Sequence, residues 1–122
     1  MTYKVFVLDD EETSCQLAKQ ALTKAGYEVM SQTKAIGATN AIRGFAPHLV
    51  LLDVMMPALS GDNLVEIIAK TIRPRPKLLF YSNKSDNELK ELVEKSGADG
   101  FICKVDGPAS LIRAVNAVLS GT

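Results

Sequence analysis

Short apolar runs recur along the chain, and a polar residue follows each of the strongest ones. The strong runs cover residues 5–8, 49–52, 78–81 and 100–103, and a weaker run covers residues 27–30. Their short length and their β-branched and aromatic content favour buried strands over helices. The pattern therefore predicts five strands, and each of the four strong runs ends directly at a polar side chain.

Between these runs, apolar residues recur at the spacing of amphipathic helices. Helices are predicted up to Gly26, over residues 36–45, after Gly61, over residues 85–95, and from Pro108 onward. Ser85 and Glu88 have the spacing of a capping box, which marks the start of the fourth helix. The inner face of the first helix is expected to carry Leu17, Ala18, Ala21, Leu22 and Ala25.

Five repeats of strand and helix predict an α/β fold, in which helices cover both faces of one parallel sheet. Sheets of this kind bind ligands outside the carboxyl ends of their strands. The polar residues at those ends are Asp9 and Asp10, Asp53, Ser82 and Lys104. The predicted fold would gather their side chains in one crevice.

The composition excludes several classes of function. The 122 residues include 14 basic and 14 acidic side chains, so the formal net charge is zero, which argues against binding to nucleic acid or an anionic membrane. Cys15 and Cys103 lie in apolar segments and are expected to be buried free thiols. The N-terminus lacks an apolar signal region and no apolar run could span a bilayer, so a cytoplasmic protein is expected.

The strand-end residues suit phosphoryl chemistry. Three neighbouring carboxylates repel one another, and Mg²⁺ relieves that repulsion because it prefers oxygen ligands. Asp53 is then a candidate nucleophile that forms an aspartyl phosphate. The Lys104 ammonium would neutralise one phosphoryl oxygen, and the Ser82 hydroxyl would donate a hydrogen bond to another. Taken singly, each residue is more typical of a turn, a cap or a solvated surface, so the prediction depends on their combination.

Four motifs stand at these strand ends: Val7-Leu8-Asp9-Asp10-Glu11, Leu51-Leu52-Asp53-Val54-Met55-Met56-Pro57 with Gly61, Ser82, and Lys104. Together they resemble the receiver domain of two-component response regulators, over residues 4 to about 119. The resemblance implies a flavodoxin-like, doubly wound (βα)5 sandwich with a five-stranded parallel sheet. It also implies that residues 1–122 form a single receiver domain, with no output domain in this chain.

The resemblance implies a role for each acidic residue. Asp53 would accept a phosphoryl group from a phosphohistidine of a sensor histidine kinase or a histidine phosphotransfer protein. Asp10 and Asp53 would bind Mg²⁺ through their side chains, and Met55 would bind it through its backbone carbonyl. Asp9 would act through a bound water.

The resemblance also implies a switch and partners. Ser82 would move toward the phosphoryl group, and Phe101 would change between outward and inward rotamers. A downstream effector protein would bind the face formed by the fourth helix, the fifth strand and the fifth helix. The domain would promote only its own phosphorylation and dephosphorylation, so it would not be an enzyme in the usual sense. It would be a monomer or a weak dimer through the last-helix face.

Several positions depart from the commonest pattern of the family. Asn83 stands where a small residue is usual, and its side chain can crowd access to the phosphoryl group. Val105 replaces the proline that usually follows Lys104 in a cis peptide, and a cis bond before valine would cost about 3 kcal/mol. We therefore expect a trans bond and a shifted loop. Met55 and Lys84 occupy positions that tune dephosphorylation, and Met55 cannot easily orient a water, which predicts a slowly decaying phosphoryl group.

Two other functions remain open. A receiver-like scaffold that does not depend on phosphorylation is favoured by Asn83 and Val105, whereas the intact acids argue against it. A Mg²⁺-dependent phosphatase-type enzyme would need a second acid just after the nucleophile, where Val54 stands.

His48, the single histidine, precedes a strand at the end away from the acids. It is expected to be a surface residue rather than a phosphodonor.

Overall fold

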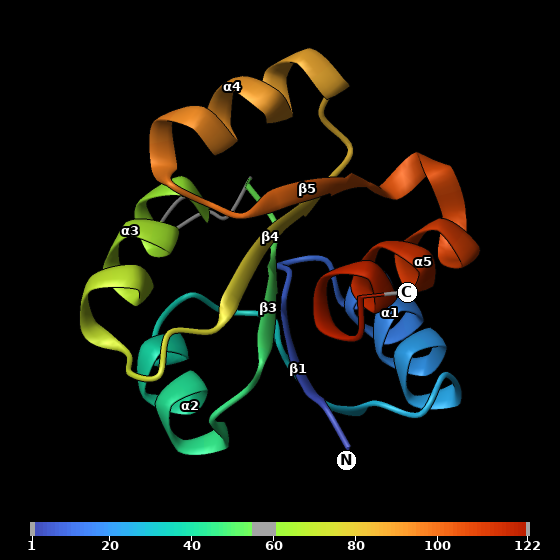
Figure 1. Ribbon diagram of the computed structural model, residues 1–122, viewed down its shortest axis with the longest axis horizontal. Helices are drawn as coiled ribbons and strands as arrows, with labels where there is room; N and C mark the ends of the chain where they lie inside the picture. The colour runs from blue at the N-terminus through green and yellow to red at the C-terminus, as the bar shows by residue number, and fades with distance from the viewer. Residues whose placement is uncertain (1, 55–60, 122) are drawn as a thin grey trace.

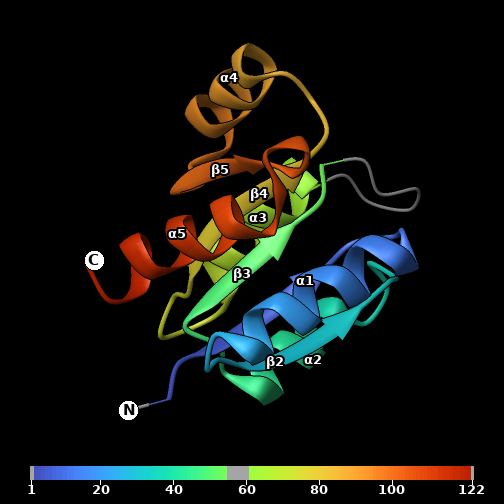
Figure 2. The ribbon, with the colours of Figure 1, turned by 90° about the vertical axis from the view of Figure 1, so that its right-hand side faces the viewer.

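The structure is a computed structural model that describes residues 2–54 and 61–121. Within these residues, five strands form one sheet in the order β2-β1-β3-β4-β5, and all neighbouring strands are parallel (Figure 1). The strands are β1 (Lys4–Leu8), β2 (Glu28–Gln32), β3 (Leu49–Leu52), β4 (Lys77–Ser82) and β5 (Gly100–Cys103). The edges of the sheet are therefore β2 and β5 (Figure 2).

Helices cover both faces of this sheet. Within the described residues they are α1 (Glu12–Lys24), α2 (Ala38–Phe45), α3 (Gly61–Thr71), α4 (Asp86–Ser96), α5 (Gly107–Leu119) and the short 3-10 helix η1 (Lys104–Asp106). One face carries α1 and α5, and the other carries α2, α3 and α4 (Figures 1 and 2). None of these helices has the length and apolar character needed to cross a membrane.

The central strands are buried on both faces, which explains their continuous apolar sequence. Alternate side chains of a strand point to opposite faces. In β1, Val5 and Val7 pack toward α1 and α5, whereas Phe6 and Leu8 pack toward α2, α3 and α4. Every residue of β3 is buried in the same two-sided way. The predicted flavodoxin-like architecture is confirmed.

The inner face of α1 is narrower than predicted. Its buried residues are Cys15, Ala18 and Leu22, which recur at three- and four-residue spacing. Leu17 is 60% exposed, and Ala25 is also exposed, so the prediction that they face the core was wrong. Leu17 immediately precedes Ala18, and a step of one residue turns the side chain about 100° around the helix axis.

Two element boundaries also differ from the prediction. The second helix begins at Ala38 rather than at Ile36, because Gly37 adopts a left-handed conformation with φ of 80°. Ile36 is consequently an exposed loop residue. The second strand continues to Gln32 because its residues pair with β1 as far as Leu8.

Ser85 caps α4 as predicted, although its hydroxyl rather than its backbone N–H bonds to the Glu88 carboxylate. The backbone N–H of Glu88 donates to the Ser85 hydroxyl oxygen at 3.3 Å, and that hydroxyl donates to the Glu88 carboxylate at 3.1 Å. The helix ends one residue later than predicted, where Gly97 adopts a left-handed φ of 83°. Both cysteines are buried free thiols, as expected.

Candidate functional site

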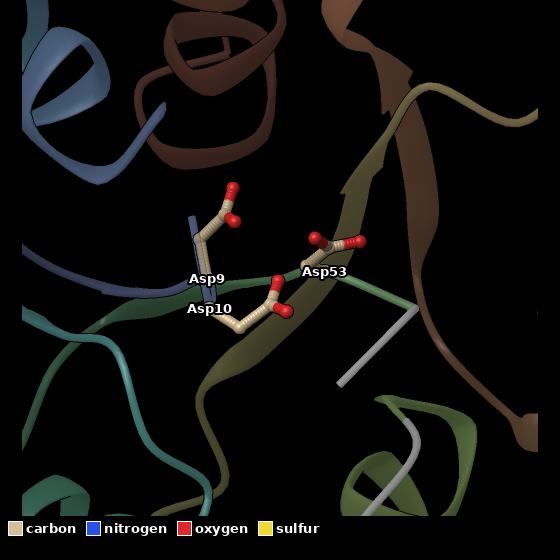
Figure 3. A group of neighbouring side chains, drawn as sticks. All are labelled: Asp9, Asp10 and Asp53. Atoms are coloured by element: carbon tan, nitrogen blue, oxygen red, sulfur yellow. The ribbon is translucent and has the colours of Figure 1, made fainter. Parts of the chain in front are cut away.

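The acidic residues at the strand ends lie together at the carboxyl edge of the sheet (Figure 3). Asp9 and Asp10 follow β1, and Asp53 follows the neighbouring strand β3. The hydrogen-bond ladder continues past both strands: the N–H of Asp9 donates to the Gln32 carbonyl at 3.2 Å, and that of Asp53 donates to the Leu8 carbonyl at 2.9 Å. Carboxylate oxygens of the three acids lie within 4.8 Å of one another.

Lys104 places its ammonium against two of these carboxylates. Its Nζ lies 2.6 Å from Oδ2 of Asp9 and 3.5 Å from Oδ2 of Asp53. Strand alternation explains why these groups come together. Asp9 and Asp53 continue the alternate positions of β1 and β3 whose side chains face α1 and α5. Lys104 comes two residues after Ile102, which faces the same helices. The three charged groups therefore emerge on one side of the sheet.

The site holds more negative charge than this one ammonium neutralises. Asp9 is 1% exposed and Asp53 is 8% exposed. Burial raises the pKa of the Asp9 carboxyl, and the Lys104 ammonium and the Glu11 N–H only partly offset this effect. Burial lowers the pKa of Lys104, but the two neighbouring carboxylates outweigh it and hold that pKa above its usual value. A further cation would be stabilised here.

The donor set fits a hard divalent cation. Oδ2 of Asp9 is buried and accepts no hydrogen bond of good geometry from the residues that the structure describes, although the Lys104 ammonium lies close to it. Oδ1 of Asp9 accepts a hydrogen bond from the Glu11 N–H at 3.0 Å, whereas Asp10 is exposed. Carboxylate oxygens completed by water are the ligands that Mg²⁺ prefers. Asp9, Asp10 and Asp53 could therefore hold Mg²⁺.

Ser82 is the last residue of β4, which pairs with β3 on the side away from β1. Its side chain is buried, and its hydroxyl oxygen accepts a weak hydrogen bond from the Lys84 N–H at 3.4 Å. Ser82 nevertheless lines the same open depression as the acids, which has a volume of about 260 Å³. Its lining residues are Asp10, Glu11, Asp53, Ser82, Asn83 and Lys104. The exposed Asn83 stands at its rim, where a side chain can limit access.

The loop after Lys104 has the predicted trans peptide bond. Within the described residues the cis bond lies at Arg73–Pro74, and the chain after β5 turns into η1. The turn leaves Val105 80% exposed. Phe101, near the start of β5, is half-buried and packs against the core beneath α2, α3 and α4.

Met55 lies outside the described residues, so its carbonyl ligand and its effect on phosphoryl lifetime stay predictions. His48 is half-buried rather than a plain surface residue. Its Nδ1 accepts a hydrogen bond from the Lys4 N–H at 2.9 Å, and its ring meets Tyr3 edge-on at 5.2 Å between centroids. His48 therefore has a packing role at the end of the sheet away from the acids.

Sequence reasoning missed two contacts near the site. The Tyr81 ring lies below the Lys104 ammonium, with 5.6 Å from Nζ to the ring centroid. The Cys103 thiol donates a hydrogen bond to the Asp86 carboxylate at 2.7 Å and thereby links β5 to the first turn of α4. Period-two alternation could have assigned Tyr81 and Lys104 each to a face of its strand, but their contact depends on the register of β4 and β5. No local pattern points to the pair of Cys103 and Asp86.

This hydrogen bond predicts an unreactive thiol. The Asp86 carboxylate, together with burial, raises the pKa of Cys103 to about 11. Only the thiolate is nucleophilic, so alkylation at pH 8.5 should be slow and should accelerate as the pH rises toward 11. In a Cys15→Ala background, Asp86→Asn should raise the iodoacetamide reaction rate about 10-fold or more. Glu88→Gln, which removes an acid from the same turn, should not change it; equal rates in both variants would contradict the assignment.

Comparison with known proteins matches residues 5–116 to the response regulator receiver domain. Chemotaxis protein CheY of Thermotoga maritima is 30% identical over 119 residues, which cover 97% of this chain and 98% of that protein. The structure of CheY4 of Vibrio cholerae has a TM-score of 0.87 at 25% identity and covers 98% of this chain and 100% of its own. The BeF3-activated DrrB receiver domain of Thermotoga maritima has a TM-score of 0.85 at 28% identity, over 98% of this chain and 99% of its own.

The relatives differ in length. The chain spans almost all of CheY, but only 49% and 58% of two related transcription regulators. The shared part is therefore the receiver domain.

Proposed function

Because the chain belongs to the response-regulator receiver family, we propose that Asp53 accepts a phosphoryl group from a phosphohistidine of a sensor kinase or phosphotransfer protein. Receiver domains of this family are regulatory rather than enzymes of the usual kind, and they switch on phosphorylation and interact with kinases and effectors. The observation that carries the proposal is the grouping of Asp9, Asp10 and Asp53, in which Asp9 and Asp53 also contact the Lys104 ammonium.

In the proposed reaction, a carboxylate oxygen of Asp53 forms a bond to phosphorus. The bond from phosphorus to the donor imidazole breaks, and its electron pair remains on the nitrogen. Little further covalent chemistry is needed, so the site contributes mainly position and charge. Lys104 already lies 3.5 Å from Asp53 Oδ2, and it would exchange this carboxylate contact for a phosphoryl oxygen.

Ser82 and Phe101 are proposed as the switch. The added phosphoryl group has strong acceptor oxygens. Within residues 2–54 and 61–121, the Ser82 hydroxyl accepts one weak hydrogen bond, from the Lys84 N–H, so it can turn and donate to the phosphoryl group. Its movement would vacate space on the side of the sheet where Phe101 packs half-buried. A local change in charge would thus bias the packing of β5 and α4.

Mg²⁺ is proposed as the cofactor, held directly by Asp10 and Asp53 and through a water by Asp9. The exposed Asp10 can turn toward an ion, whereas Asp9 is engaged by Lys104 and the Glu11 N–H. When bound, the ion would neutralise part of the phosphoryl charge.

Asp10→Asn is expected to weaken Mg²⁺ binding about 10-fold or more, because it removes one of the anionic ligands. Calorimetric titration with MgCl2 measures this directly. Saturating Mg²⁺ should also raise the melting temperature of the wild type more than that of the variant. Glu12→Gln removes an acid that lies outside the group and should bind as the wild type does. Equal affinities for the Asp10 variant and the wild type would exclude Asp10 as a ligand.

The function itself is tested by incubating the protein with acetyl phosphate and Mg²⁺ and measuring its intact mass. A gain of one phosphoryl group supports the proposal. Absence of any gain would favour the phosphorylation-independent scaffold, and continuous hydrolysis of the donor without an adduct would favour an enzyme. The proposal has three further parts. Residues 1–122 form a single receiver domain, a cognate kinase and an effector protein bind it, and it is a monomer or a weak dimer through the α5 face.

A further inference from the structure

Tyr81 lies at the site, although the proposed chemistry does not use it. It is the second-last residue of β4, and it pairs in register with Ile102 of β5. Lys104 follows Ile102 by two residues, so its side chain lies on the same face of the sheet as that of Tyr81. The Lys104 Nζ consequently lies over the Tyr81 ring, 5.6 Å from its centroid.

Among the described residues, two carboxylates and one aromatic ring lie next to the Lys104 ammonium. Asp9 and Asp53 contact it with their carboxylates, at 2.6 and 3.5 Å, and the ring of Tyr81 covers another side. Only 10% of the Lys104 side chain is exposed, so water contributes little to its solvation. The electron-rich face of an aromatic ring attracts a cation most strongly where water is excluded.

Tyr81 also borders a cavity next to Lys104. Tyr81 and Lys104 both line a space of about 170 Å³ between α1 and the start of α5, which Leu17 and Pro108 also line. A smaller side chain at position 81 would enlarge this cavity and let water reach the ammonium. Burial raises the pKa of the Tyr81 phenol, so the ring is uncharged at neutral pH and attracts the lysine through its face.

We propose that Tyr81 is a positioning residue of the phosphoryl site, whose ring face holds the Lys104 ammonium beside Asp9 and Asp53. The ring then sets the position from which Lys104 meets an incoming phosphoryl group. The expected effect on the rate of phosphoryl uptake rests on the proposed function, whereas the contact between Tyr81 and Lys104 does not. A plain packing role predicts that any apolar side chain of similar size would serve equally well.

The contact is tested on the unphosphorylated protein by NMR. A lysine side chain held over an aromatic ring has its ε-methylene protons shifted upfield by the ring current. The Lys104 signal, assigned with Lys104→Arg, should show this shift in the wild type and in Tyr81→Phe. It should return to the ordinary lysine position in Tyr81→Leu. An ordinary Lys104 position in the wild type would overturn the proposal without any variant.

The consequence is tested by the initial rate of phosphoryl uptake from acetyl phosphate and Mg²⁺. Tyr81→Leu should be slower by about 30-fold, the scale of a desolvated cation–π contact, and Tyr81→Phe should stay within about two-fold of the wild type. Tyr3→Leu, which removes a half-buried tyrosine at the far end of the sheet, serves as the matched control and should not change the rate.

Two results would refute the positioning role. One is an unchanged rate in Tyr81→Leu, and the other is an equal loss in the leucine and phenylalanine variants. Failure of the wild type to take up a phosphoryl group would instead refute the proposed function, and the NMR comparison would still decide whether Tyr81 holds Lys104. Amide spectra and melting temperatures of all variants identify any loss of fold.

Discussion

Asp53→Asn is expected to reduce phosphoryl uptake from acetyl phosphate below detection in intact-mass measurements. The neutral amide lacks the nucleophilic carboxylate oxygen and one anionic Mg²⁺ ligand. The two side chains have the same shape, and the backbone hydrogen bond from residue 53 to the Leu8 carbonyl does not involve the side chain. The fold should therefore persist, and the loss of uptake would report on chemistry alone.

Asp106→Asn is the matched control for this variant. Asp106 is an exposed acid in η1, at the same end of the sheet but outside the acidic group, and its replacement should leave uptake unchanged. Uptake by the Asp53 variant at the wild-type rate would assign the nucleophile to another residue. Peptide mapping of the modified protein would then show which of the neighbouring carboxylates carries the group.

Phe80→Ala is expected to lower the free energy of unfolding by about 3–5 kcal/mol, the usual cost of deleting a fully buried phenyl ring. Phe80 is 0% exposed on the inner strand β4, between Leu52 of β3 and Phe101 of β5. Its ring fills the core beneath α2, α3 and α4. Urea unfolding followed by circular dichroism measures the change, and an unaltered slope would show that the variant still unfolds in one step.

Phe101→Ala is the control for the loss of unfolding free energy in Phe80→Ala. Phe101 pairs with Phe80 in the sheet but is only half-buried, so its truncation should cost about 1–2 kcal/mol. A ring that is weakly held can change position at low cost, as the proposed switch requires. Equal destabilisation by the two variants would mean that Phe101 is an ordinary core residue, and the switch would then have to lie elsewhere.

The elements that the sequence predicted well are those in which local pattern and tertiary environment agree. The run at residues 49–52 was predicted as a buried strand, because burial on both faces of a sheet accommodates four consecutive aliphatic residues. The position of Asp53 followed from the end of this strand. Leu17 shows the opposite case, because an apolar residue beside the inner row of α1 faces solvent. The local pattern of apolar residues could not distinguish this exposed leucine from the core residues next to it.

By itself, the sequence determined the order of strands and helices along the chain and the polar residue at each strand end. The tertiary structure decided which of these residues meet. Lys104 contacts Asp9 rather than the exposed Asp10, and Tyr81 lies beneath that lysine. The physical reason is that period-two alternation assigns each side chain to a face, whereas contacts depend on strand order and register between segments far apart in sequence. The burial of the site residues and the contacts between their charges therefore depend on that register.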